Sequence, residues 1–106
     1  MRILIDECPP KKLKRELVDC IVFTVQEKGW SSLKNGELLC VSAGEFHVFI
    51  TADQNIECQQ NLSLFDIAVV VLVASHNRVE SLQPLIPKLN EVLKITQPGE
   101  IILISA

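Results

Sequence analysis

The sequence predicts an α/β fold in which a mostly parallel sheet is covered by helices on both faces. Five short apolar runs, rich in β-branched residues, alternate with segments that carry turn or helix signals. The runs are predicted strands, and they cover residues 1–7, 21–25, 47–51, 67–73 and 100–104. Because strands that alternate with helices build parallel sheets, we expect a three-layer, five-stranded sheet of Rossmann-like topology.

Length and composition describe one ordinary globular unit. The 106 residues correspond to a single domain, 1–106, and 48% apolar with 22% charged residues is typical of a folded protein. The four cysteines lack C-x-x-C spacing, which favours reduced thiols in a cytoplasmic protein. The chain starts directly with a strand-like run, and its longest apolar run is far shorter than the ~20 residues of a membrane helix. We therefore expect no membrane association.

The first strand is predicted to lie in the centre of the sheet and to end at two carboxylates. Residues 3–5 are all apolar, as in strands that are buried on both faces. Pro9 and Pro10 lack backbone N–H groups and cannot continue a central strand. Asp6 and Glu7 are therefore expected where this strand leaves the sheet.

Three helices are predicted between the strands. The first covers residues 9–18, with its prolines in the first turn and Leu13 and Leu17 at helical spacing, and a second helix begins near Asn35. The third runs through residues 77–93, with Pro84 and Pro87 expected to kink or divide it near its start. The turn before residues 100–104 leaves the direction of the last strand open.

The predicted topology brings acidic residues together. Right-handed crossovers favour the strand order 2-1-3-4-5, which makes the first and third strands neighbours. Asp6 and Asp53 follow these two strands, so they should converge at the carboxyl edge, where parallel sheets bind ligands. Glu37 opens the helix before the third strand and is expected at the same edge. The direction of the Glu7 side chain stays open.

Such a cluster is typical of a metal site. Two carboxylates about 4 Å apart repel by roughly 4 kcal/mol at an effective dielectric constant near 20, so protons or a hard cation should neutralise them. Oxygen ligands suit Mg²⁺ or Mn²⁺, and Asn55 adds a carbonyl oxygen. A metal in this position can activate water for phosphodiester cleavage. Asp and Asn are also common as turn and cap residues, which is the structural alternative for each one alone.

A basic segment begins at the same edge. Lys11, Lys12 and Arg15 lie within five residues of one another, although the net charge of the chain is −3. Their charges suit the phosphate backbone of RNA, and a solvated helix face is the alternative.

The motifs together resemble the compact PIN-like proteins. The resemblance spans nearly the whole chain and rests on Ile-Asp-Glu-x-x-Pro at 5–10, Lys-Asn-x-Glu-Leu at 34–38 and Phe-Ile-Thr-x-Asp-x-Asn at 49–55. It implies a PIN-like fold and a Mg²⁺- or Mn²⁺-dependent ribonuclease, similar to the toxin of a bacterial toxin–antitoxin pair. By this resemblance Asp6, Glu37 and Asp53 bind metal and carry catalysis, Asn55 assists them, and the partners are an RNA substrate and a cognate antitoxin protein. Asn55 stands where larger PIN domains have a fourth acid.

Two other functions fit the same pattern. A phosphorelay receiver domain also has an acidic pair after its first strand and an aspartate after its third, but it needs a lysine after the fifth strand, where this chain has Ser105 and Ala106. A non-catalytic module could bind a partner protein at the acidic edge. The sequence also leaves open whether two copies form a homodimer.

Overall fold

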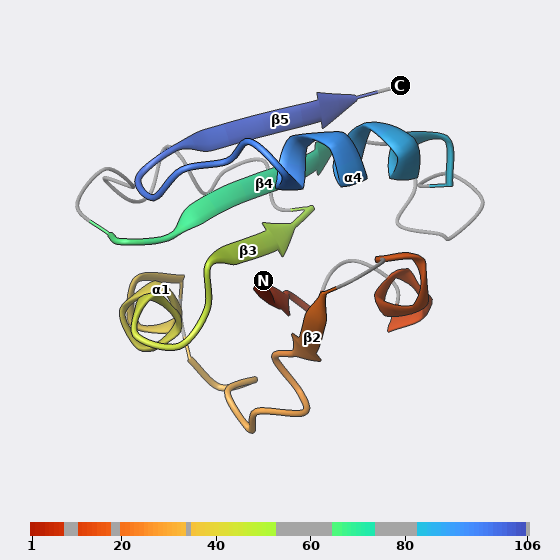
Figure 1. Ribbon diagram of the computed structural model, residues 1–106. Helices are drawn as coiled ribbons and strands as arrows, with labels where there is room; N and C mark the ends of the chain where they lie inside the picture. Colours follow the sequence, from red (N-terminus) through yellow and green to blue (C-terminus); the bar gives the residue numbers. More distant parts are fainter. Residues whose placement is uncertain (8–10, 18–19, 34, 53–64, 74–82, 106) are drawn as a thin grey trace.

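The computed structural model describes residues 1–7, 11–17, 20–33, 35–52, 65–73 and 83–105 (Figure 1). Its centre is one sheet in the order β2-β1-β3-β4-β5, with every neighbouring pair parallel. The predicted strand order is therefore confirmed, and the last strand is parallel to the rest. The strands are β1 (Arg2–Ile5), β2 (Ile21–Thr24), β3 (Val48–Thr51), β4 (Ala68–Val73) and β5 (Ile101–Ser105).

The central strands are buried on both faces, as their continuous apolar runs predict. Every residue of β3 is buried, and so are residues 3–5 of β1 and 68–72 of β4. Since successive side chains point to opposite faces, each of these strands feeds two separate hydrophobic clusters. β1 therefore lies in the middle of the molecule, between β2 and β3.

One face of the sheet is covered by η1 (Lys11–Glu16) and α4 (Ile86–Leu93). Figure 1 shows both on the same side of the strands. The short segment η1 and the residue after it contribute Leu13 and Leu17 to this cluster, and α4 contributes Leu89 and Leu93 from consecutive turns. The apolar spacing in the sequence thus marks the residues that pack on the sheet.

The opposite face is covered by α1 (Asn35–Ala43), which supplies Leu38 and Leu39. Trp30 and Phe46 pack against this cluster edge to face, with ring centroids 6.1 Å apart. The helix predicted to begin near Asn35 is confirmed. Helices on both faces of the sheet give the three layers that the alternation of strands and helices predicts.

Two predicted helices differ from the structure. The segment η1 is a 3-10 helix rather than an α-helix. A segment of six residues is too short for helix propensity alone to decide its form, and short 3-10 helices are common as connectors. The third helix is divided as its prolines predict, with a 3-10 turn, η3 (Gln83–Leu85), before α4. The expected start of that helix at residues 77–82 lies outside the described residues.

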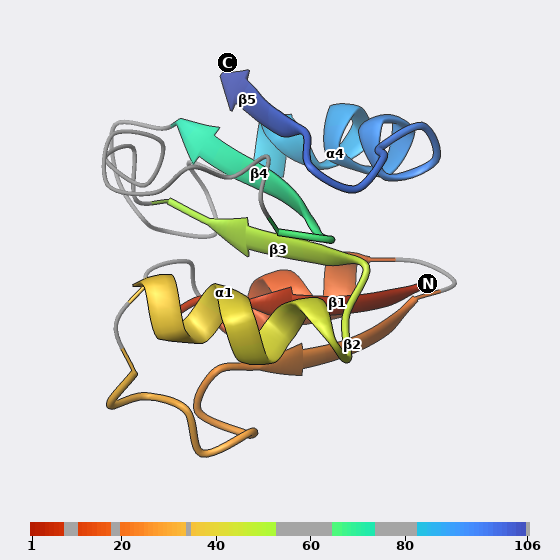
Figure 2. The ribbon, with the colours of Figure 1, turned by 90° about the vertical axis from the view of Figure 1, so that its left-hand side faces the viewer.

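The connections do not all have the same hand. The β2–β3 connection crosses the sheet through α1 on one face, and the β4–β5 connection crosses through α4 on the other. Both move in the same direction along the strand order, so their hands are opposite. Figure 2 shows α1 in front of the strands in the right-handed arrangement, with α4 behind them. The expectation of right-handed crossovers is therefore wrong for β4–β5, where the apolar stripe of α4 is buried against Ile104 and its neighbours.

None of the helices in the described ranges is long and apolar enough to cross a membrane.

Candidate functional site

Asp6 lies at the carboxyl edge of the sheet, directly after β1. Its backbone N–H donates to the carbonyl of Ile50 at 2.8 Å, which continues the pairing of β1 with β3 by one residue. Its carboxylate accepts two further hydrogen bonds, one on Oδ1 from the Glu7 N–H at 2.8 Å and one on Oδ2 from the Thr51 hydroxyl at 2.7 Å. Three hydrogen bonds therefore fix the position and orientation of the Asp6 carboxylate.

Thr51 is a site residue that the sequence interpretation missed. It is the last residue of β3 and is fully buried, at 0% exposure, although its side chain is polar. Buried hydroxyls need hydrogen-bond partners, and Thr51 finds one across the strand boundary in Asp6. The signal in the sequence was a lone threonine that ends an otherwise apolar strand. Such a residue is suited to hold a neighbouring carboxylate.

The two flanking glutamates lie on the surface. Glu7 is exposed, and its backbone N–H makes the contact with Asp6. Glu37 is exposed in the first turn of α1, where the helix dipole favours a negative charge. Figure 2 shows this end of α1 at the edge toward which the strand arrows point. The first turn of α1, which contains Glu37, therefore lies toward the carboxyl edge of the sheet, and no described contact joins Glu37 to Asp6.

The other half of the predicted site, Asp53 and Asn55, lies outside the described residues. Thr51, two residues before Asp53, ends its strand beside Asp6. Within the described ranges, no group of three or more Asp, Glu, His or Cys residues is arranged to hold a metal ion. A metal site at this edge would therefore need Asp53 or Asn55 in addition to Asp6. The donors that the edge does present, a carboxylate and a hydroxyl, are the hard oxygen atoms that Mg²⁺ and Mn²⁺ prefer.

The basic segment next to this edge is part of η1. Lys11 and Lys12 are its first two residues, and Arg15 is exposed in its last turn. Lys14 is ion-paired, since its Nζ donates to both carboxylate oxygens of Glu27 at 2.9 Å. Among the candidate cations, Arg15 is thus shown to face solvent, and Lys14 is committed to a contact within the protein.

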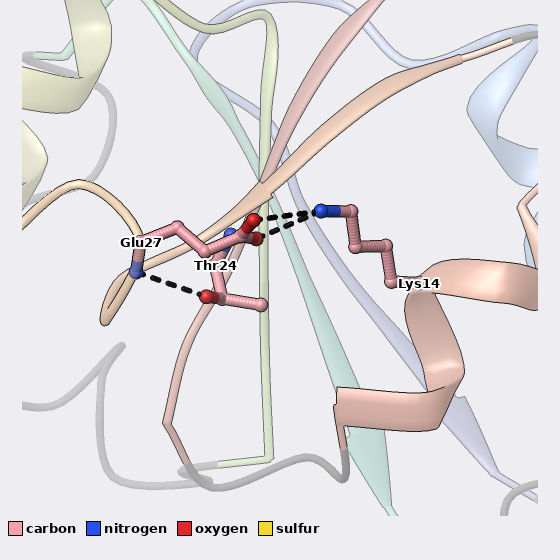
Figure 3. Close-up of polar contacts among 3 residues, drawn as sticks. All are labelled: Lys14, Thr24 and Glu27. Atoms are coloured by element: carbon pink, nitrogen blue, oxygen red, sulfur yellow. Dashed lines mark hydrogen bonds and ion pairs between the residues drawn. The ribbon is translucent and has the colours of Figure 1, made fainter.

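A reciprocal hydrogen-bond pair fixes the turn after β2 (Figure 3). The Thr24 hydroxyl accepts from the Glu27 N–H at 3.1 Å, and the Glu27 carboxylate accepts from the Thr24 N–H at 2.9 Å. This is the capping-box arrangement, Thr-x-x-Glu, and it was readable in the sequence. The Lys14 ammonium and the Thr24 N–H hold the pKa of the Glu27 carboxyl below its ordinary value of 4.5. The Lys14 pair also ties η1 to the end of β2.

The described residues line two surface hollows beside the sheet. One of about 340 Å³ lies beside the capping box, and Arg15 and Gln26 form part of its wall. The other, of about 470 Å³, is lined by residues before β1, β3 and β5, including His47 and Gln97, and so lies at the opposite edge from Asp6. The larger hollow is therefore remote from Asp6.

Comparison of the sequence with protein-family models finds no match, and comparisons with curated proteins and with solved structures find none either. The fold defines a small α/β protein with a five-stranded, all-parallel sheet.

Proposed function

We propose that the protein is a PIN-like, Mg²⁺- or Mn²⁺-dependent ribonuclease, of the kind that serves as the toxin of a toxin–antitoxin pair. The observation that carries the proposal is the Asp6 carboxylate, which is fixed by Thr51 between the two neighbouring strands β1 and β3. Ligand sites of open parallel sheets lie at such a point. An aspartate that only capped a turn would not need a buried hydroxyl from a second strand.

The roles follow from position. Asp6 and Asp53 would hold the metal ion, with Glu37 and the Asn55 carbonyl completing an oxygen-only set. A divalent cation bound there supplies charge that polarises a phosphate and lowers the pKa of water. Thr51 keeps the Asp6 carboxylate in one orientation, so that its free lone pairs face a ligand in a fixed direction. Arg15, with Lys11 and Lys12, would contact the RNA backbone.

The test is cleavage of RNA by the pure protein with and without Mn²⁺, beside Asp6→Asn and Asp53→Asn. We expect both substitutions to abolish metal-dependent cleavage and to remove the rise in melting temperature on adding metal, because each deletes a charged ligand. Asp66→Asn is the matched control, since Asp66 is an exposed aspartate beside the hollow at the opposite edge. Cleavage by Asp6→Asn and Asp53→Asn at the wild-type rate would refute the site.

Two further outcomes separate the ribonuclease from the alternative functions. The strand order 2-1-3-4-5 is also that of receiver domains, so it favours neither function. Labelling of Asp53 by a small phosphate donor, without RNA cleavage, would indicate a receiver-like domain. A wild-type protein that neither cleaves RNA nor is stabilised by metal, but captures a partner through the Asp6 edge, would indicate a binding module.

A further inference from the structure

Within the described part of the chain, the outer edge of β5 carries backbone groups that pair with no other strand. β5 pairs with β4 in the register Val69 with Ile101 and Val71 with Leu103, and the Val69 N–H donates to the Glu100 carbonyl at 2.9 Å. In a parallel ladder this bond means that the Glu100 carbonyl and both backbone groups of Ile102 point toward β4, whereas the Glu100 N–H donates to the Gln97 carbonyl. Ile101, Leu103 and Ser105 therefore point theirs away from the sheet. Figures 1 and 2 both show β5 as the outermost strand, with no described element beyond it.

The other edge strand of the sheet is capped at one of its outward groups. The N–H groups of Ile21 in β2 and of Val25 just after it donate to the carbonyls of Met1 and Ile5, so the Thr24 N–H points outward. That N–H is already bonded to Glu27, whose charge is in turn paired with Lys14. Capping and charge are common means of preventing a strand edge from pairing with another chain. Along β5 the described residues contain neither device.

The side chains of β5 favour association as well. The strand reads Ile-Ile-Leu-Ile-Ser, with no charge and no proline. Leu103 is 51% exposed on the face opposite to α4, although it stands in the middle of the strand. An exposed leucine at the centre of an uncharged, uncapped edge is a common feature of strands that pair between chains.

We propose that two copies of this chain associate through β5, in antiparallel register about a two-fold axis at Leu103. In this register Leu103 pairs with the partner's Leu103, and Ile101 pairs with the partner's Ser105. Each is a hydrogen-bonded pair that exchanges two N–H···O bonds. The occupant is a second copy because a strand with its outward groups centred on one residue is complementary to itself under a two-fold rotation. No charge meets a like charge along the paired segments.

The resulting sheet has ten strands, and its two acidic edges point in opposite directions. A two-fold axis perpendicular to the sheet reverses the strand direction of the second copy, so the partner's Asp6 lies at the opposite edge. Neither copy completes the site of the other. The association is therefore independent of the proposed ribonuclease function, and either can fail without the other.

The experiment is sedimentation velocity of the full chain between about 1 and about 200 μM, a range that covers micromolar dissociation constants. We expect the wild type to move from monomer to dimer over this range. Leu103→Lys should stay monomeric, because two lysines would face each other across the axis. Ile21→Lys is the matched control, since Ile21 is 54% exposed on the opposite edge strand, and it should dimerise like the wild type.

Amide exchange provides a second measurement on unmodified protein. The amides of Ile101, Leu103 and Ser105 should exchange more slowly as concentration rises, whereas that of Val22, on the outer side of β2, should not change. Thermal melts show whether Leu103→Lys is folded, and the exchange result holds even if it is not. A wild-type monomer at the highest concentration, or a Leu103→Lys dimer, would overturn the proposal.

Discussion

The environment of Asp6 is set by two residues from different parts of the chain. Glu7 is its neighbour in sequence, whereas Thr51 arrives from β3 because β1 and β3 pair in parallel. A hydrogen bond to a carboxylate is stronger and shorter than one between neutral groups. The orientation of the Asp6 carboxylate therefore depends on the pairing of β1 with β3, and not only on its neighbours in the loop.

Removal of the Thr51 hydroxyl tests this role as a positioning residue. Thr51→Val keeps the shape of the side chain but leaves the Asp6 Oδ2 without its donor, so we expect a loss of about 1–3 kcal/mol in the free energy of unfolding. RNA cleavage should fall by about ten- to hundredfold, because the carboxylate loses its fixed orientation. Chemical denaturation and a cleavage assay measure the two effects.

Two further variants interpret that result. Thr51→Ser restores a hydroxyl and should recover most of the cleavage. Ser42→Ala removes a different buried hydroxyl, which donates to the Leu38 carbonyl within α1, and should leave cleavage unchanged. If Thr51→Ser were as inactive as Thr51→Val, a hydroxyl at this position would not be sufficient to orient Asp6, and the positioning role would be contradicted.

Glu27 gives the fold a dependence on pH with a defined sign. Its pKa is lowered in the folded protein, first by the Lys14 ammonium, so the folded state favours the carboxylate. The stabilisation is therefore present above the ordinary value of 4.5 and is lost as the pH falls through the lower, folded-state pKa. We expect Glu27→Gln to lower the melting temperature at about pH 7, and we expect this difference from the wild type to shrink as the pH falls below 4.5.

Lys14→Met removes the same ion pair from the other side and should show the same trend. A difference between Glu27→Gln and the wild type that stayed constant with pH would mean that the ion pair does not stabilise the fold.

The strands were more predictable than the connections between them. Each apolar run became a strand within about two residues of its expected ends, because β1, β3 and β4 are buried on both faces. The 3-10 form of η1 and the position of α4 depend on tertiary packing, which periodicity along one segment does not contain. The sequence pattern thus predicted that Asp6 follows the first strand. The contact of Asp6 with Thr51 could not be predicted, because it depends on the register between β1 and β3.

The basic segment η1 makes a prediction that belongs to the element as a whole. If Lys11, Lys12 and Arg15 bind the RNA backbone, reversing the first two to glutamate should weaken RNA binding at low salt. The slope of log K against log salt should fall by about 0.7 for each lost contact with single-stranded RNA. Fluorescence anisotropy at several salt concentrations measures both.

Lys88→Glu with Lys94→Glu is the control, because both lysines are exposed and lie in or next to α4. It makes the same change in net charge at another place. An equal loss of affinity in both pairs would mean that total charge, and not η1, determines binding.

At the scale of the whole molecule, the sheet is asymmetric between its two edges. The β2 edge is capped by Glu27 and joined to η1 through Lys14, whereas the β5 edge presents Leu103 to solvent. The two connections of opposite hand place α1 and α4 on different faces, so both sheet faces carry a hydrophobic cluster. Both faces of the sheet are thus covered in the described part of the chain, and the association proposed above would cover the edge at β5.

The central position of β1 has a consequence for synthesis. β1 leaves the ribosome before either neighbour exists, and its partners in β3 follow about 45 residues later. Until then residues 3–5 can pair only with the edge strand β2, and such an incompletely covered apolar segment is of the kind that chaperones bind. Before β3 emerges, β1 has only β2 as a neighbour, and two strands alone do not form a stable sheet. We therefore expect the nascent chain to acquire protease resistance late, only after β3 has emerged from the exit tunnel.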